Sequence, residues 1–258
     1  MKKLFAPLAA CALILAACQT NLKTAVYTDE YVLPLHEMRQ DSLAVNISVE
    51  YPVGSDEATF ALRKNLCDFL FDYGWDTEEG CVDSIALCYR KSVVDEYLNE
   101  FLQSAADTTD ERIMSWERSI DGRFLPDWDK YHRYEAEFYE YSAGAHGQST
   151  RVYYVFDKKD GSLVEESEFF REGYEEPVTE LIRKHLQSDY IPQLEADGFD
   201  VEELLNSPVS PASACVNGVF LPGPKGVSWV FQPYEIAPYS FGIITVEVPW
   251  KELKAWVR

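Results

Sequence analysis

The stretch SLAVNISVEY, residues 42–51, alternates apolar and polar side chains without a break. Every second residue from Leu43 to Tyr51 is apolar. Because successive side chains of a strand point to opposite faces, this pattern predicts a strand with one buried and one solvated face. A sheet with one apolar face must be covered on that face by another layer, and helices predicted nearby supply it.

The segment after this strand predicts a compact helical unit. Pro52 and Gly54 end the strand, and apolar residues then recur at helical spacing. We interpret residues 82–89 as a short strand. A second helix is expected to begin at Ser92, where Asp95 completes a capping box.

The rest of the chain predicts a second unit. Residues 107–130 are polar and are interpreted as an irregular linker that exposes its tryptophans. Strands are then expected around HRYEAEFYEY and RVYYVFD, with a hairpin turn at Asp160-Gly161 before another strand. Pro177 opens a predicted helix. Two further strands and a short terminal helix follow. The predicted class is α+β: antiparallel sheets with helices on one face, in two successive modules, residues 41–128 and 129–258.

The first twenty residues, MKKLFAPLAACALILAACQT, have the order of a bacterial lipoprotein signal. Two lysines precede an apolar run too short to span a bilayer, and small residues lead into Cys18. We expect removal of residues 1–17 and acyl chains on Cys18 that anchor the protein to a membrane. Gln19, rather than Asp, follows the cysteine, which favours the outer membrane. Residues 18–40 are expected to be a tether.

Acidic side chains dominate the charge. The chain has 44 Asp and Glu against 23 Lys and Arg, a formal net charge of −21. Such a field repels nucleic acid and attracts basic proteins, although solubility alone also accounts for it. We expect no nucleic-acid partner. The four histidines are scattered and no HExxH or CxxC motif occurs, so we expect no metal site and no cofactor.

Four cysteines follow Cys18 in the sequence: Cys67, Cys81, Cys88 and Cys215. An even number in an exported chain predicts up to two disulfides, and free buried thiols are the alternative. All three pairings stay open. A bond between Cys81 and Cys88 is disfavoured if both lie on a strand, because their side chains would then point to opposite faces.

Two loops contain the candidate binding residues, which are Gly144, His146, Tyr234, Glu235 and Tyr239. A catalytic His146 would need an orienting acid and a nucleophile, and no Gly-x-Ser-x-Gly elbow accompanies it. We interpret its loop of small residues chiefly as structural. Contact with a partner is the second interpretation, and catalysis is the third.

Three stretches together resemble a known bacterial arrangement. They are YSAGAHGQSTRVYYVFDKKDGSLV, VSWVFQPYEIAPYSFGIITVEVPWKELKAWV, and an earlier strand ending in EYP. The chain resembles a DUF4163 module followed by a DUF3298 module, the latter over roughly residues 130–257. The family often has two glycines before the loop histidine, where this chain has Ala143-Gly144.

The resemblance implies an exported or membrane-held binding domain. A related module belongs to an anti-sigma factor that senses lysozyme, and another precedes a peptidoglycan deacetylase domain that supplies the chemistry. We therefore expect a non-catalytic, lipid-anchored envelope protein that binds a protein, such as a lysozyme-like one, or a peptidoglycan-like ligand. The alternatives are an envelope hydrolase that uses His146 and a structural lipoprotein.

Overall fold

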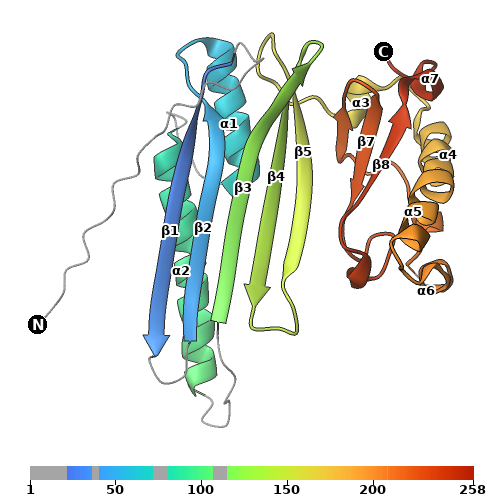
Figure 1. Cartoon of the computed structure of the whole chain (residues 1–258). Coiled ribbons are helices and arrows are strands. Elements are labelled where there is room, and N and C mark those ends of the chain that lie inside the picture. Colours follow the sequence, from blue (N-terminus) through green and yellow to red (C-terminus); the bar gives the residue numbers. More distant parts are fainter. Residues whose placement is uncertain (1–21, 37–40, 72–80, 107–114, 208) are drawn as a thin grey trace, which may run out of the picture.

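The computed structural model describes residues 22–36, 41–71, 81–106, 115–207 and 209–258. A five-stranded mixed sheet is followed by a smaller three-stranded antiparallel sheet with its own helices (Figure 1). The prediction of an α+β chain with two successive modules is confirmed. The expected signal peptide and Cys18 lie outside the described residues. None of the helices described combines the length and the apolar character needed to cross a membrane.

Five strands form the large sheet in their chain order: β1 (Thr24–His36), β2 (Asp41–Pro52), β3 (Ser115–Trp128), β4 (Tyr131–Ser142) and β5 (Gln148–Asp157). Neighbouring strands are antiparallel except β2 and β3, which are parallel. Parallel neighbours need a crossover. Here α1 (Glu57–Phe71) and α2 (Val82–Ala106) provide it.

The strand predicted from strict alternation is β2, and its pattern is confirmed. Leu43, Val45, Ile47 and Val49 are buried, and the residues between them are half-buried. The apolar face packs against α1 and α2, which cover the same side of the sheet in Figure 1. The half-buried residues of β2 lie on the opposite face, away from these helices.

The tether predicted for residues 18–40 is wrong over the range of β1. Residues 24–36 pair along the length of β2, with Tyr27 opposite Val49. Tyr27 is buried, whereas Val32 is 64% exposed. An edge strand that is only partly buried has a weak hydrophobic period, and for this reason the sequence resembled a linker.

The predicted strand at 82–89 and the helix start at Ser92 are also wrong, because both lie inside α2. Val82, Ile85 and Ala86 are buried at helical spacing. The Ser92 hydroxyl donates a hydrogen bond to the Tyr89 carbonyl oxygen at 2.7 Å, as serine does inside helices.

Part of the predicted irregular linker is β3, and the predicted module boundary at 128/129 therefore cuts a β-hairpin. Trp116 is only 8% exposed, and Trp128 stacks on Trp250 with ring centroids 4.8 Å apart. Both β4 and β5 belong to the first sheet, so the first module extends to residue 157. Residues 107–114 lie outside the described part of the chain.

The second module begins with a short helix where a strand was expected. Leu163 forms an isolated bridge to Phe156, and the chain then enters α3 (Glu166–Phe169). The turn at Asp160-Gly161 is confirmed, because Gly161 has φ +72° and its amide bonds the Asp157 carbonyl.

Helices and three strands complete the second module. The helix predicted at Pro177 is confirmed as α4 (Glu175–His185). A π-helical turn, Leu186–Tyr190, continues into α5 (Ile191–Ala196), and α6 (Val201–Asn206) follows. The sheet consists of β6 (Phe220–Pro222), β7 (Gly226–Phe231) and β8 (Ile244–Pro249), and α7 (Trp250–Leu253) ends the chain's regular structure. Short 3-10 turns lie at Pro211–Ser213 and Tyr239–Phe241.

The two modules share apolar packing. Tyr131 and Val155, from the large sheet, belong to the core of the second module. The buried Arg133 of β4 donates from Nη1 to the Pro222 carbonyl at 3.0 Å and from Nε to the Pro126 carbonyl at 2.7 Å. The modules are therefore joined by packing and by hydrogen bonds as well as by the chain.

Candidate aromatic binding surface

The two loops that contain the candidate residues meet in the structure. The His146 ring stacks on Tyr239 with centroids 3.9 Å apart and planes inclined by 24°. The Tyr234 hydroxyl lies 3.3 Å from His146 Nε2. Tyr239 donates from its hydroxyl to the Gly147 carbonyl at 2.7 Å. We call His146, Tyr234 and Tyr239 the aromatic triplet.

The first loop owes its conformation to small residues. Ala143 has φ +55°, in the left-handed region that glycine occupies more easily. This is one of the two positions where the DUF3298 resemblance favours glycine. At Gly147 a Cβ atom would come within 2.3 Å of the Tyr139 hydroxyl, so a larger residue here would force the Tyr139 ring to move. Gly144 is exposed, and the space beside it is open.

The second loop holds Tyr234 outward. Its φ is +70°, its amide bonds the Ala237 carbonyl at 3.0 Å, and its side chain is 52% exposed. Glu235 has a structural role, because its carboxylate accepts from the Gln232 amide at 2.8 Å and from the Asn217 side chain at 3.0 Å. The carboxylate therefore closes the turn that presents Tyr234.

The contacts of His146 are those of a structural or binding side chain. Nδ1 lies 3.0 Å from the Gly147 carbonyl oxygen. Because a carbonyl only accepts, Nδ1 donates, and in the neutral ring Nε2 then accepts from the Tyr234 hydroxyl. Within the described ranges, neither a serine nor a carboxylate makes a hydrogen bond or ion pair with His146. The triad geometry of a hydrolase is not formed there.

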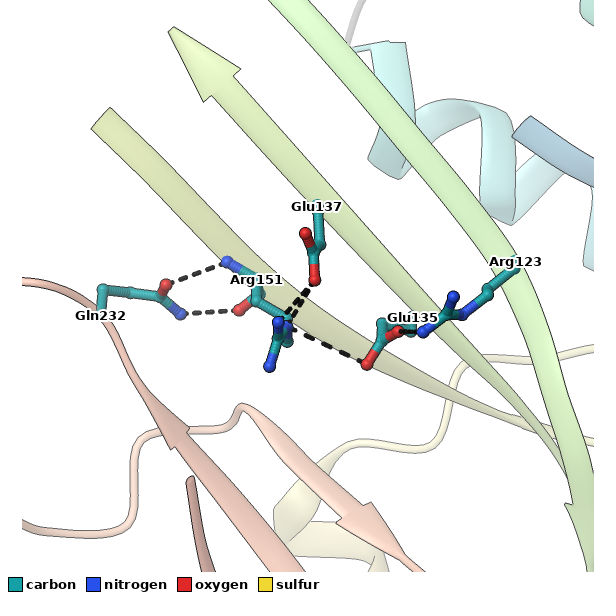
Figure 2. A network of polar contacts seen from close by, with 5 residues as sticks. All are labelled: Arg123, Glu135, Glu137, Arg151 and Gln232. Carbon is teal, nitrogen blue, oxygen red and sulfur yellow. Dashed lines mark hydrogen bonds and ion pairs between the residues drawn. The ribbon is translucent and has the colours of Figure 1, made fainter. Parts of the chain in front are cut away.

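A side-chain amide fixes the second loop to the large sheet (Figure 2). Gln232 accepts from the Arg151 backbone amide at 3.0 Å and donates to the Arg151 carbonyl at 2.7 Å. The Arg151 side chain in turn pairs with Glu137, and Glu135 pairs with Arg123. Sequence reasoning did not find Gln232, because no local pattern marks a glutamine that bonds a strand 81 residues away.

A buried carboxylate lies in the second module, and sequence reasoning missed this one as well. Glu166 is 6% exposed, and it accepts from the Trp229 indole and from the Gly218 amide. Burial raises the pKa of Glu166 above its ordinary value, although both hydrogen bonds oppose the shift. The residue lines a groove between β5 and the second module.

The predicted disulfides are not formed, because Cys67, Cys81, Cys88 and Cys215 are all free. Cys67 is buried in the first core, and burial raises the pKa of its thiol to about 12, which makes it a poor nucleophile. Among the residues that the structure describes, no three His, Cys, Asp or Glu side chains gather closely enough to hold a metal ion.

Comparison with known proteins identifies the second module and the fold. Residues 167–251 match the family DUF3298, described as a protein of unknown function; the match is shorter than the predicted 130–257. No curated protein matches the sequence. A solved DUF3298 member from Bacteroides fragilis NCTC 9343 is similar in structure, with a TM-score of 0.77, 17% identity, and coverage of 92% of this chain and 94% of that one.

A second solved structure, a DUF3298 family protein from Pseudomonas aeruginosa PAO1, has a TM-score of 0.59 at 17% identity, with 93% of this chain and 96% of that one covered. Identities this low establish the shared fold alone. The likeness nevertheless covers both modules, since most of each chain is included.

Proposed function

We propose that this protein is a lipid-anchored component of the cell envelope that binds a partner through the aromatic triplet and performs no chemistry on it. The lipoprotein-like start supports the anchor on Cys18, and Gln19 supports the outer membrane as its location. In this proposal the first module is DUF4163-like. The observation that carries the binding role is the triplet itself, two loops joined so that Tyr234 is presented outward on a fixed turn.

The triplet has the properties of a recognition surface. Tyrosine supplies a large amphipathic contact area at a low cost in conformational entropy, and the stacked His146 and Tyr239 restrict it further. The partner favoured by a net charge of −21 is a basic protein, for which lysozyme is a suitable probe. A peptidoglycan-like glycan is the second candidate, because tyrosine rings also stack on sugars.

A pull-down tests the proposal. The soluble form, from residue 21 onward, is expected to retain lysozyme, and retention should weaken as salt rises because screening shortens the range of the attraction. Tyr234→Ala should reduce affinity by about tenfold or more, the scale of an interface hot spot. Leu87→Ala, which truncates a side chain 45% exposed on α2, serves as the matched control.

Peptidoglycan takes the place of lysozyme in a parallel experiment. Retention of neither probe, or equal retention of the Tyr234 and Leu87 variants, would contradict the proposed binding surface. The hydrolase alternative has its own test: ester or peptidoglycan turnover that is lost in a folded His146→Ala variant would favour the enzyme. Crosslinking to other envelope proteins without either ligand would favour a structural lipoprotein.

A further inference from the structure

A groove separates the outer edge of β5 from the second module. Its volume is about 380 Å³, and Tyr153 and Val155 of β5 line it on one side. Val164 and Val219 supply apolar walls on the other side, next to the buried Glu166. Its size falls in the range of small-ligand sites.

The edge of β5 is paired at both ends of this groove. At one end, the Arg151 amide and carbonyl both bond the Gln232 side chain, at 3.0 and 2.7 Å. At the other end, the Val155 carbonyl accepts from the Val164 amide at 2.8 Å. Strand edges with free amides and carbonyls attract other chains, and both contacts cover part of this edge.

Between these two contacts, the edge is left open at both backbone groups of Tyr153 and, among the described residues, at the Val155 amide as well. Backbone groups of alternate residues in a strand point to the same edge, so the amide and carbonyl of Tyr153 face the same way as those of Arg151 and Val155. Neither group has a hydrogen-bond partner within the described part of the chain. The Tyr153 amide and carbonyl therefore form an open donor and acceptor pair at the groove.

The length of the unpaired part of the β5 edge limits the length of the ligand that can bind there. Arg151 and Val155 are four residues apart, about 13 Å along the strand. A strand longer than about three residues would collide with Gln232 at one end and with Val164 at the other. One residue of an extended peptide presents its own amide and carbonyl side by side, which matches the open pair on Tyr153. Gln232 already makes this type of double contact at Arg151.

We propose that the β5 groove binds a short extended peptide of about three residues, whose middle residue pairs with the backbone of Tyr153. The apolar walls favour small aliphatic side chains. The groove is separate from the aromatic triplet, so this site goes beyond the proposed function and does not depend on it.

Nuclear magnetic resonance can observe Tyr153 directly. A Val-Tyr sequence occurs only at residues 26–27 and 152–153, so carbonyl-labelled valine with nitrogen-labelled tyrosine gives two amide signals. Tyr27 is buried in the first core and is the internal control. A Val152→Ile variant, which removes one labelled pair, assigns the Tyr153 signal.

The probe is tri-alanine with an acetylated start and an amidated end. It should shift the Tyr153 signal in a saturable way, with half-saturation on the order of 1 mM, the range of weak ligands. The Tyr27 signal should not move. The same peptide methylated on the middle nitrogen lacks the donor and should shift Tyr153 at least tenfold less at equal concentration.

Two results would overturn this site: an unmoved Tyr153 signal at saturating peptide, or equal shifts with the methylated peptide. A Tyr153 shift caused by lysozyme but not by the tripeptide would also overturn it, and would place the β5 edge in a protein interface. Lysozyme retention is measured separately on the same sample. Failure of peptide binding at the β5 groove can therefore be distinguished from failure of lysozyme binding at the aromatic triplet.

Discussion

The burial of Glu166 makes the stability of the folded protein depend on pH. Its carboxylate accepts from Trp229 and Gly218 inside the second module, and burial raises its pKa. A carboxyl group with a raised pKa holds its proton more tightly in the folded state than in the unfolded state. The free energy of unfolding therefore falls as pH rises from the ordinary pKa through the raised one.

Replacing this carboxyl group should remove that pH dependence. Glu166→Gln does not titrate, so the fall in stability as pH rises above the ordinary glutamate pKa should be smaller than in the wild type. Glu172→Gln, at an exposed position, is the control and should leave the slope unchanged. Urea unfolding at a series of pH values measures the slope. An identical slope in the Glu166 variant would show that burial does not shift this group.

At the scale of elements, the Gln232 side chain makes the two hydrogen bonds to β5 that a neighbouring strand would otherwise make. Its side-chain amide satisfies both backbone groups of Arg151, so the loop carrying Tyr234 is fixed to β5.

Gln232→Leu keeps a similar volume but leaves two part-buried backbone groups of Arg151 without partners. We expect a loss of about 1–3 kcal/mol in the free energy of unfolding. Urea unfolding measures this loss, and Gln187→Leu on the surface should cost far less. Equal losses would mean that water replaces the amide.

The elements predicted correctly from sequence are those with a strong local period. The strict alternation of β2 and the aromatic strands β4 and β5 needed no long-range information. For α2 the helical signal was present, since Val82, Ile85, Ala86 and Tyr89 follow helical spacing, but the short apolar run was interpreted as a strand. Edge strand β1 has little period to detect, because apolar Val32 lies on its exposed face and Asp29 lies on the same face as the buried Tyr27.

The candidate site was predictable only in part. Both loops were chosen from their residue types, and the structure brings His146, Tyr234 and Tyr239 into contact. Their meeting depends on packing between residues 88 positions apart, which no local pattern encodes. For the same reason Gln232 and the groove beside Tyr153 could not be anticipated.

On the scale of the whole molecule, Arg133 connects the two modules. It is only 8% exposed and bonds two carbonyl groups, one of them on β6. Because Tyr131 and Val155 of the large sheet are part of the core of the second module, we expect the wild-type protein to unfold in one cooperative transition.

Removing the hydrogen bonds of Arg133 should make the two modules unfold in separate thermal transitions. Arg133→Met leaves two carbonyl oxygens without a charged donor, at a cost of about 3 kcal/mol. Calorimetry should then show the second module melting before the first. The control is Arg123→Met, which breaks the ion pair of an exposed arginine with Glu135 and should cost less than about 1 kcal/mol. A single transition in the Arg133 variant, shifted as little as in the Arg123 variant, would contradict this role.

The parallel contact between β2 and β3 has a consequence for how the chain folds. The strands β3, β4 and β5 are consecutive in the chain and antiparallel, so they can pair early through contacts between residues close in sequence. Strand β2 can join them only after both crossover helices have formed and docked, which closes a long loop at an entropic cost. Because β1 pairs with β2 as its antiparallel neighbour in the chain, docking of this pair against β3 is the expected slow event of folding, and until it happens the edge of β3 that faces β2 lacks its partner strand.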